Sequence, residues 1–195
     1  MSRLKQAIAA IDAVNAGDPN QVSMDGRPQA KELVYSQRMT QWLFRIEPNP
    51  SEVLQLAARA QHIARWEVPR STYPDGRIGY LQWRTGLYLR HADRTETILR
   101  QVGYDQETID HVRRLLRKQG LKSDPEMQML EDAVCLVFLQ YELADFLPKH
   151  PEEKVVEILR KTWKKMSPRG HAAAQTLLSG LSDPVRQLIS RALAN

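Results

Sequence analysis

Apolar residues recur at helical spacing along most of the chain. A first stripe consists of Tyr35, Met39, Trp42, Leu43 and Ile46. Comparable stripes run through residues 53–64, 81–102 and 109–116. Spacings of three and four residues place side chains on one face of an α-helix. No stretch alternates with a period of two for long enough to predict a strand, so the pattern predicts an all-α protein.

Short polar residues stand where the predicted helices begin. A side chain at this position accepts a hydrogen bond from the first turn, and the candidates are Ser51, Asp105 and Asp124. Gly103 is expected to end the long helix. A further helix is expected from His150–Glu153 to about Met166, followed by a short helical pair. Residues 17–29 and 67–77 are expected to be irregular, which leaves a single domain over residues 1–195 with roughly seven to nine helices.

Composition adds limits rather than a function. Hydrophobic residues make up 42% and charged residues 26% of the chain, as in ordinary globular proteins. The formal net charge of +5 and the pI of about 9.4 suit an anionic small molecule or RNA as partner. The single cysteine, Cys135, excludes an intrachain disulfide and indicates a reducing compartment. No apolar run reaches about 18 residues, so we expect a cytoplasmic protein with no membrane partner.

Two adjacent acids, Glu131 and Asp132, fall within an almost uninterrupted apolar helix. An isolated buried carboxylate costs several kcal/mol unless it is paired, hydrogen-bonded or bound to a metal. At least one of the two acids therefore needs a dedicated partner, either an arginine or a divalent metal shared with histidines. For Asp132 we expect contact with His62 or His91, directly or through a metal.

Two histidines are candidates for this partnership. His62 lies almost opposite the apolar stripe of its predicted helix, which is typical either of a surface histidine or of one that points into a polar cleft. His91 flanks the stripe of the long helix, where the alternative to a functional role is a boundary histidine that bonds a carbonyl.

Arginine and aromatic side chains crowd the second irregular stretch and its flanks. Guanidinium groups bind phosphate bidentately, and aromatic faces stack on bases. The group comprises Arg65, Trp66, Arg70, Tyr73, Arg77, Tyr80, Trp83 and Arg84. A second cluster, Lys161–Lys165, has a similar composition. Cations at helix ends and solvated lysines are the alternative interpretation.

Several phrases of the sequence together resemble a known family. They are Ala60–Ile63, Arg65–Trp66, Pro69–Arg70, Tyr73–Pro74, Gly79–Tyr80, Trp83–Arg84, His91–Ala92, Leu130–Asp132, Cys135–Leu139 and Lys161–Ser167. They resemble the domain-of-unknown-function family 4202 along nearly the whole chain. That resemblance implies no activity.

A more distant similarity is to the HD-domain superfamily, whose all-helical members are commonly metal-dependent phosphohydrolases. It implies an HD-like core at about residues 50–147, with His62, His91 and Asp132 as metal ligands. Ala92 stands where the family has the aspartate of its His-Asp pair. Glu131 would then supply the missing carboxylate.

The resemblance implies a metal-dependent phosphohydrolase that acts on a phosphorylated small molecule or nucleotide. Two imidazoles and a carboxylate suit Mn, Fe, Co or Zn, with Glu131 and Asp132 as the catalytic acids. Substrate binding would involve Arg70, Arg77, Arg84, Trp66 and Tyr80. The alternative is a non-catalytic nucleotide- or RNA-binding module on a degenerate HD scaffold. A protein-interaction scaffold is a third class, for which the sequence offers no specific feature.

Overall fold

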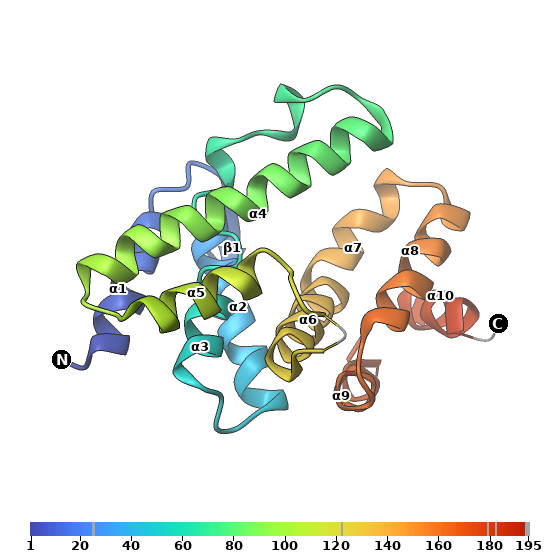
Figure 1. Cartoon of the computed structure of the whole chain (residues 1–195). Helices are drawn as coiled ribbons and strands as arrows, with labels where there is room; N and C mark the ends of the chain where they lie inside the picture. The colour runs from blue at the N-terminus through green and yellow to red at the C-terminus, as the bar shows by residue number, and fades with distance from the viewer. Residues whose placement is uncertain (25, 122, 179, 182, 194–195) are drawn as a thin grey trace.

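The computed structural model describes residues 1–24, 26–121, 123–178, 180–181 and 183–193, which form ten α-helices and one small sheet (Figure 1). The predicted all-α class is confirmed. The helices are α1 (Arg3–Asn15), α2 (Lys31–Ile46), α3 (Glu52–Arg59), α4 (Gly76–Gln101), α5 (Gln106–Leu116), α6 (Pro125–Val137), α7 (Leu143–Phe146), α8 (Glu152–Lys165), α9 (Pro168–Leu178) and α10 (Asp183–Leu193).

The predicted helix starts carry the expected caps. Ser51 Oγ accepts a hydrogen bond from the Leu54 amide at 3.0 Å, and Asp124 Oδ1 accepts one from the Glu126 amide at 2.9 Å. Asp105 does the same for α5. At Gly103, just past the end of α4, φ is +84°, a conformation that glycine adopts without strain.

The first irregular stretch was predicted wrongly in part, because residues 17–29 contain an antiparallel hairpin. Strands β1 (Gln21–Met24) and β2 (Arg27–Ala30) are too short and too polar to show a period. The buried Asp18 fixes the hairpin against α2. Its carboxylate accepts hydrogen bonds from the Asn20 amide at 2.9 Å and from the Glu32 amide at 3.0 Å.

The helix predicted over residues 53–64 is shorter than expected. Helix α3 ends at Arg59, and the next five residues form a turn that closes with Ala64 at a φ of +53°. Ala60 and Ile63 remain buried in that turn. Because these two buried residues are apolar, the apolar pattern of the sequence extends beyond the end of the helix, and this is why it predicted a longer helix. His62 therefore lies on a turn rather than on a helix.

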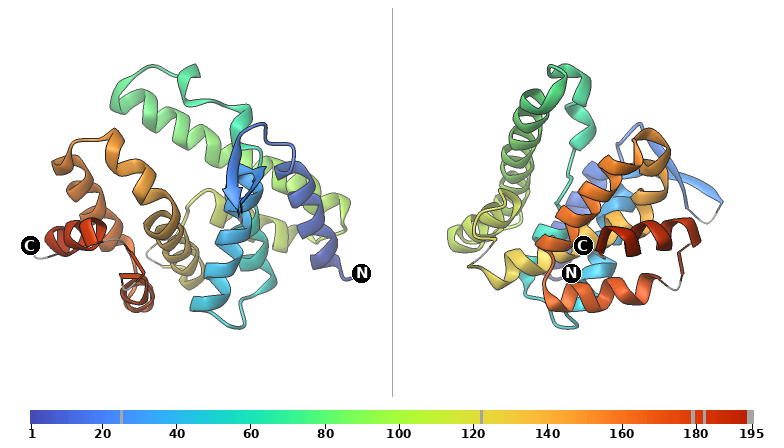
Figure 2. Two further views of the ribbon diagram at one scale, coloured as in Figure 1. Left: turned by 180° about the vertical axis from the view of Figure 1, so that it is seen from behind. Right: turned by 90° about the vertical axis from the view of Figure 1, so that its right-hand side faces the viewer.

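The core lies where α2 packs against α3 and α6, and α4 packs against α5. Figures 1 and 2 show α4 along one side of the molecule and α8 to α10 along the other, with α6 between them. None of the helices in the described ranges is long and apolar enough to span a lipid bilayer.

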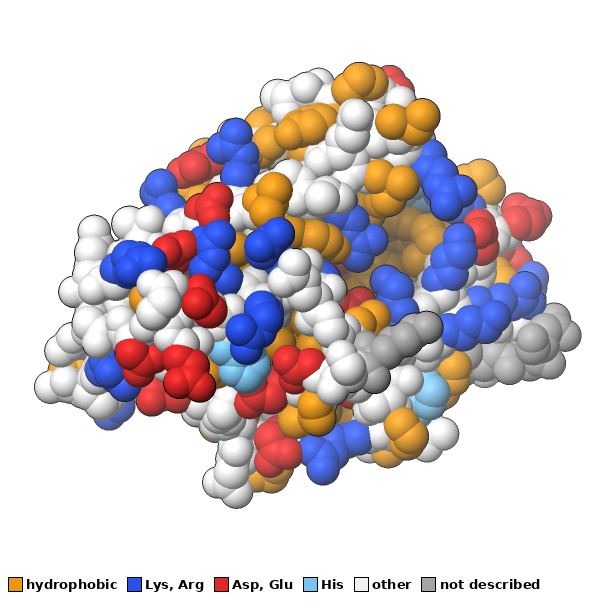
Figure 3. All heavy atoms as spheres, in the orientation of Figure 1, with side chains coloured by type: hydrophobic (Ala, Val, Ile, Leu, Met, Phe, Trp, Pro, Cys, Tyr) orange, Lys and Arg blue, Asp and Glu red, His pale blue; other side chains and the backbone are white. Residues whose placement is uncertain are grey.

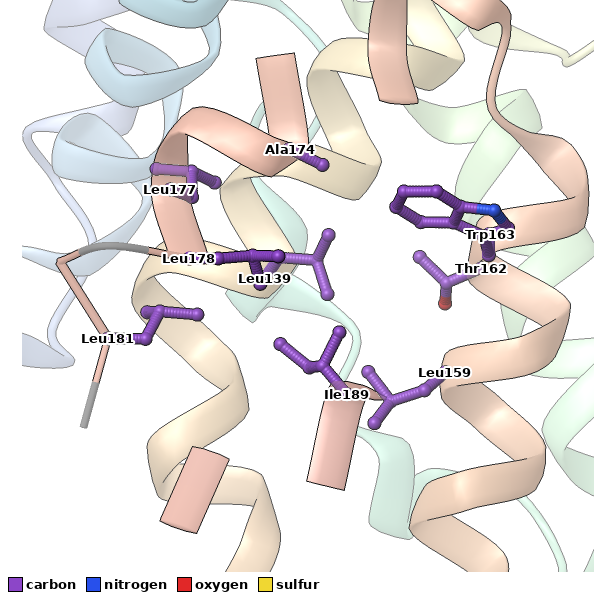
Figure 4. A pocket seen from close by; sticks show the side chains of 9 residues that line it. All are labelled: Leu139, Leu159, Thr162, Trp163, Ala174, Leu177, Leu178, Leu181 and Ile189. Atoms are coloured by element: carbon purple, nitrogen blue, oxygen red, sulfur yellow. The ribbon is translucent and has the colours of Figure 1, made fainter. Parts of the chain in front are cut away.

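The three C-terminal helices meet in an apolar seam against Leu139, just after α6 (Figure 4). It leaves a cavity of only about 10 Å³, lined by Leu139, Leu159, Thr162, Trp163, Ala174, Leu177, Leu178, Leu181 and Ile189. That space holds about one water molecule. The seam is therefore packing rather than a ligand site.

Because Asp18 caps α2, we expect Asp18→Ala to lower the free energy of unfolding by about 1–2 kcal/mol. Asp18→Asn keeps an acceptor oxygen and should cost much less. Urea unfolding of the three proteins measures the difference. Equal stability of wild type and Asp18→Ala would show that the cap contributes nothing.

Candidate functional site

A cavity of about 270 Å³ lies between α4, the turn after α3, α6 and α8. Figure 3 shows a hollow in this region, with Lys and Arg side chains around it. The polar and aromatic lining residues are Tyr35, Gln61, His62, Arg65, Tyr80, Trp83, Arg84, Tyr88, His91, Lys118, Glu131, Phe138, Glu142, Thr162 and Lys165. We call this space the first cavity.

Two lysines of the first cavity are paired with an acid. Glu131 Oε2 lies 3.1 Å from Lys118 Nζ, and Glu131 Oε1 lies 3.5 Å from Lys165 Nζ. Although burial alone raises the pKa of Glu131, the two positive charges lower it below its usual range. The acid therefore stays ionised. The predicted dedicated partner exists, but it is a pair of lysines rather than an arginine or a metal.

The two arginines of the first cavity have neutral partners instead. Arg65 Nη1 donates to His62 Nε2 at 2.7 Å and stacks over Trp83, whereas Arg84 Nε donates to the Tyr88 hydroxyl. Among the residues that the structure describes, neither guanidinium forms an ion pair with a carboxylate. Nearby acids such as Glu32, Glu142 and Glu131 therefore act on these charges only at a distance, without a direct contact.

His62 is fixed on three sides. Its ring stacks on Tyr35 with centroids 3.9 Å apart, and its Nδ1 lies 3.3 Å from Glu32 Oε2. Since arginine only donates, Nε2 must accept from Arg65 and Nδ1 carries the proton. Burial and the nearby Arg65 charge lower the pKa of His62 well below its usual range. The ring is therefore neutral at physiological pH.

His91 is buried on α4 at the wall of the first cavity. Its Nδ1 bonds the Ile63 carbonyl at 2.8 Å, and its ring centroid lies 6.0 Å from that of His62. Burial, together with His62, lowers the pKa of His91 to about 3. The sequence left open a functional role or a boundary histidine that bonds a carbonyl. The bond to Ile63 matches the second alternative.

Asp132 does not meet either histidine, and that expectation is wrong. Its Oδ1 accepts from the Ser167 amide at 2.8 Å and from Gln128 Nε2 at 3.1 Å, and its Oδ2 accepts from the Ser167 hydroxyl at 2.5 Å. Adjacent helical side chains point about 100° apart. Glu131 therefore faces the first cavity while Asp132 faces the start of α9. A Cβ on Gly170 would lie 2.6 Å from Asp132 Oδ1, so only glycine fits there.

The residues present do not fit the metal site that the sequence suggested. Among the described residues, no group of three or more His, Cys, Asp or Glu side chains is placed to hold a metal ion. His62 contacts Arg65 and Glu32 through its two nitrogens, while Asp132 lies against α9. We therefore derive no chemistry through a metal.

The predicted substrate-binding residues divide into two groups. Arg84 and Tyr80 line the first cavity, whereas Trp66, Arg70 and Arg77 do not. Arg70 instead holds its own loop, donating to the carbonyls of Tyr73 and Pro74 at 2.9 Å each.

Sequence reasoning missed Lys118, which follows α5 with a φ of +58°. Nothing local in the sequence marks a lysine that reaches a helix 13 residues further on. Tyr35 belongs to the stripe that predicts a core helix, so its ring facing His62 could not be distinguished from core packing. Arg65 did carry a signal, because it follows His62 by one helical turn.

The family model for a domain of unknown function (DUF4202) matches residues 5–189, so the chain belongs to that family. This confirms the first of the two resemblances. No curated protein and no solved structure matches the chain. Any activity must therefore be inferred from the cavity itself.

The buried neutral His91 predicts a pH effect on stability. In the unfolded chain the imidazole of His91 becomes protonated near pH 6.5. In the folded protein, where its pKa is about 3, the same imidazole stays neutral at that pH. The free energy of unfolding should therefore fall as the pH drops below 6.5, by up to about 1.4 kcal/mol per pH unit. Burial raises the pKa of Glu32 to about 7, which acts in the opposite direction.

Comparison with His91→Asn isolates the histidine because Glu32 is present in both proteins. Between pH 6.5 and 5, wild type should lose about 2 kcal/mol relative to the variant in urea unfolding. Parallel pH profiles would contradict the neutral assignment.

The Asp132 contacts predict a loss without any metal dependence. Asp132→Ala leaves the Ser167 amide unsatisfied and should cost about 3 kcal/mol. Ser167→Ala keeps the amide bond but removes the hydroxyl bond to Asp132 and the bond that the hydroxyl accepts from the Gly170 amide, and it should cost about 1–2 kcal/mol. Denaturant unfolding with and without a chelator should give the same values; chelator-induced loss in wild type alone would support a metal at Asp132.

Proposed function

We propose that this member of the DUF4202 family binds a phosphorylated small molecule or nucleotide in the first cavity. The observation that carries the proposal is the pair of guanidinium groups, Arg65 and Arg84, that share one cavity and have only neutral partners. A cation that is partly removed from water is destabilised by the loss of its hydration, and a bound anion stabilises it again.

The balance of charge in the first cavity favours an anion. Arg65, Arg84, Lys118 and Lys165 line it against two acids, Glu131 and Glu142. Arg65 and Arg84 can turn from His62 and Tyr88 to the oxygens of a ligand without leaving a bare carboxylate behind. Phosphate matches the fork of donors on a guanidinium better than a single-point anion does.

The aromatic lining favours an organic phosphate. Tyr80 and Trp83 lie with ring centroids 5.9 Å apart on the α4 wall, and Tyr35 lines the cavity from α2. Ring faces of this kind stack on nucleobases and on sugars. The phosphate would lie at the arginines, with the remainder of the ligand against these rings.

Cavity size separates a small ligand from RNA. A volume of about 270 Å³ is close to the range of small-molecule sites. An RNA strand requires a longer basic groove with successive stacking platforms. The proposal therefore concerns a small phosphorylated ligand, and metal-dependent hydrolysis is not part of it.

Isothermal titration with pyrophosphate, AMP, ADP and ATP tests the proposal. We expect binding that weakens at high salt, since the contacts are largely ionic. Arg84→Met should weaken it by at least about tenfold, as for a lost charged hydrogen bond. Arg77→Met is the matched control: it removes the same charge from an exposed position on α4 outside the cavity and should change affinity less than about twofold.

Equal losses in the two variants would mean that general surface charge, rather than the first cavity, attracts the ligand. Absence of binding by all four probes would refute the proposal for nucleotides and for the phosphate group itself, because pyrophosphate requires no particular organic part.

A further inference from the structure

A second cavity of about 600 Å³ adjoins the first. Tyr35, His62, Arg65 and Glu142 line both spaces. The second cavity is lined further by the acids Glu32 and Asp145 and by the cations Lys31, Arg38 and Lys149. A ligand bound at Arg65 therefore lies at the boundary of the two spaces, next to the acids of the second.

Glu32 presents a poorly satisfied carboxylate to the second cavity. Its side chain is 7% exposed, and its Oε2 makes no hydrogen bond among the described residues. His62 Nδ1 lies 3.3 Å from this oxygen, but the ring is neutral and not aligned for a hydrogen bond. Burial raises the pKa of Glu32 to about 7. A positively charged ligand group is the natural complement of such an acid.

Glu142 is a second acid of the same kind. It ends the π-helical turn η3 (Phe138–Glu142), and within the described chain its carboxylate makes no hydrogen bond or ion pair. Burial raises its pKa as well. Gln140, in the same turn, accepts a hydrogen bond from Trp42 Nε1 at 2.8 Å and so fixes the turn. π-helical turns within α-helices occur frequently at functional sites.

The cations that line the second cavity offset these acids only in part and from a distance. Lys31 and Lys149 are exposed, and Arg38 stacks over the Tyr141 ring at 4.0 Å. None of the three forms an ion pair in the described part of the chain. Arg65 is the largest electrostatic influence on both acids, yet it is also the group assigned to the phosphate.

We propose that the ligand carries a protonated primary amine as well as a phosphate, with Glu32 and Glu142 holding the amine and Arg65 and Arg84 holding the phosphate. This inference rests on the proposed function. Once Arg65 engages phosphate, the two acids need another cation, and an ammonium on the same ligand supplies it. The ligand class is therefore an amino-bearing phosphate monoester, such as an amino-sugar phosphate or a phosphorylated amino alcohol.

Matched ligand pairs test the amine separately from the phosphate. Glucosamine 6-phosphate is compared with glucose 6-phosphate, and O-phosphoethanolamine with ethyl phosphate, by isothermal titration of the full chain. We expect the amine member of at least one pair to bind at least about tenfold more tightly, the effect of one charge-assisted contact. Glu32→Gln and Glu142→Gln should each reduce that preference to about twofold or less, with little change for the amine-free member.

Asp145→Asn is the control variant, because Asp145 is an exposed acid of the same cavity and should leave the preference intact. Arg84→Met should weaken both members of a pair alike. If Glu32→Gln fails to fold, as shown by its far-ultraviolet circular dichroism, Glu142→Gln alone decides, since that side chain supports no other described group.

Equal affinity within both pairs would overturn the inference while leaving phosphate binding intact. A preference that survives in the Gln variants would overturn it as well, because the amine would then be bound elsewhere. Failure of all four ligands and of pyrophosphate to bind would instead remove the proposed function, and the inference with it.

Discussion

Helix α6 must bury two adjacent carboxylates, and the arrangement around it follows from how they are satisfied. Glu131 is held by Lys118, which follows α5, and by Lys165 at the end of α8. Asp132 is held by Ser167, just before α9. Gln128 also donates to the Lys165 carbonyl at 2.8 Å. Since a buried unpaired carboxylate costs several kcal/mol, these contacts fix the corner between α8 and α9 and with it one wall of the first cavity.

That arrangement also determines which cations remain for a ligand. Glu131 neutralises both lysines of the first cavity in part, whereas Arg65 and Arg84 contact only a neutral imidazole and a phenol. The charges that hold the fold and those that the proposed ligand would contact are thus on different residues. Substitution at Glu131 would disturb packing and cavity charge together, whereas Arg84 can be changed with little effect on the core because its one hydrogen-bond partner is Tyr88, on its own helix.

Local signals in the sequence predicted what depends on neighbouring residues. Ser51, Asp105 and Asp124 cap their helices because a cap bonds amides two or three residues away. The partner of Asp132 lies 35 residues away, and no spacing rule connects the two. The predicted contact with His62 failed for a second reason, because α3 ends at Arg59 and the turn carries His62 toward Tyr35 and Glu32. Both errors therefore come from tertiary geometry, whereas the apolar pattern around Glu131 and Asp132 was enough to predict that at least one of them has a dedicated partner.

The position of His62 explains why two cavities of different character adjoin. Arg65 lies at Nε2 and Glu32 near Nδ1, on opposite sides of one neutral ring. If the arginine and the glutamate paired directly, each would satisfy the other, and neither cavity would gain from a ligand. The stacking of the ring on Tyr35 and the deeply lowered pKa of His62 keep a neutral group between them. The ring thus keeps the cation and the acid from pairing directly, so that Arg65 lines both cavities while Glu32 lines the second.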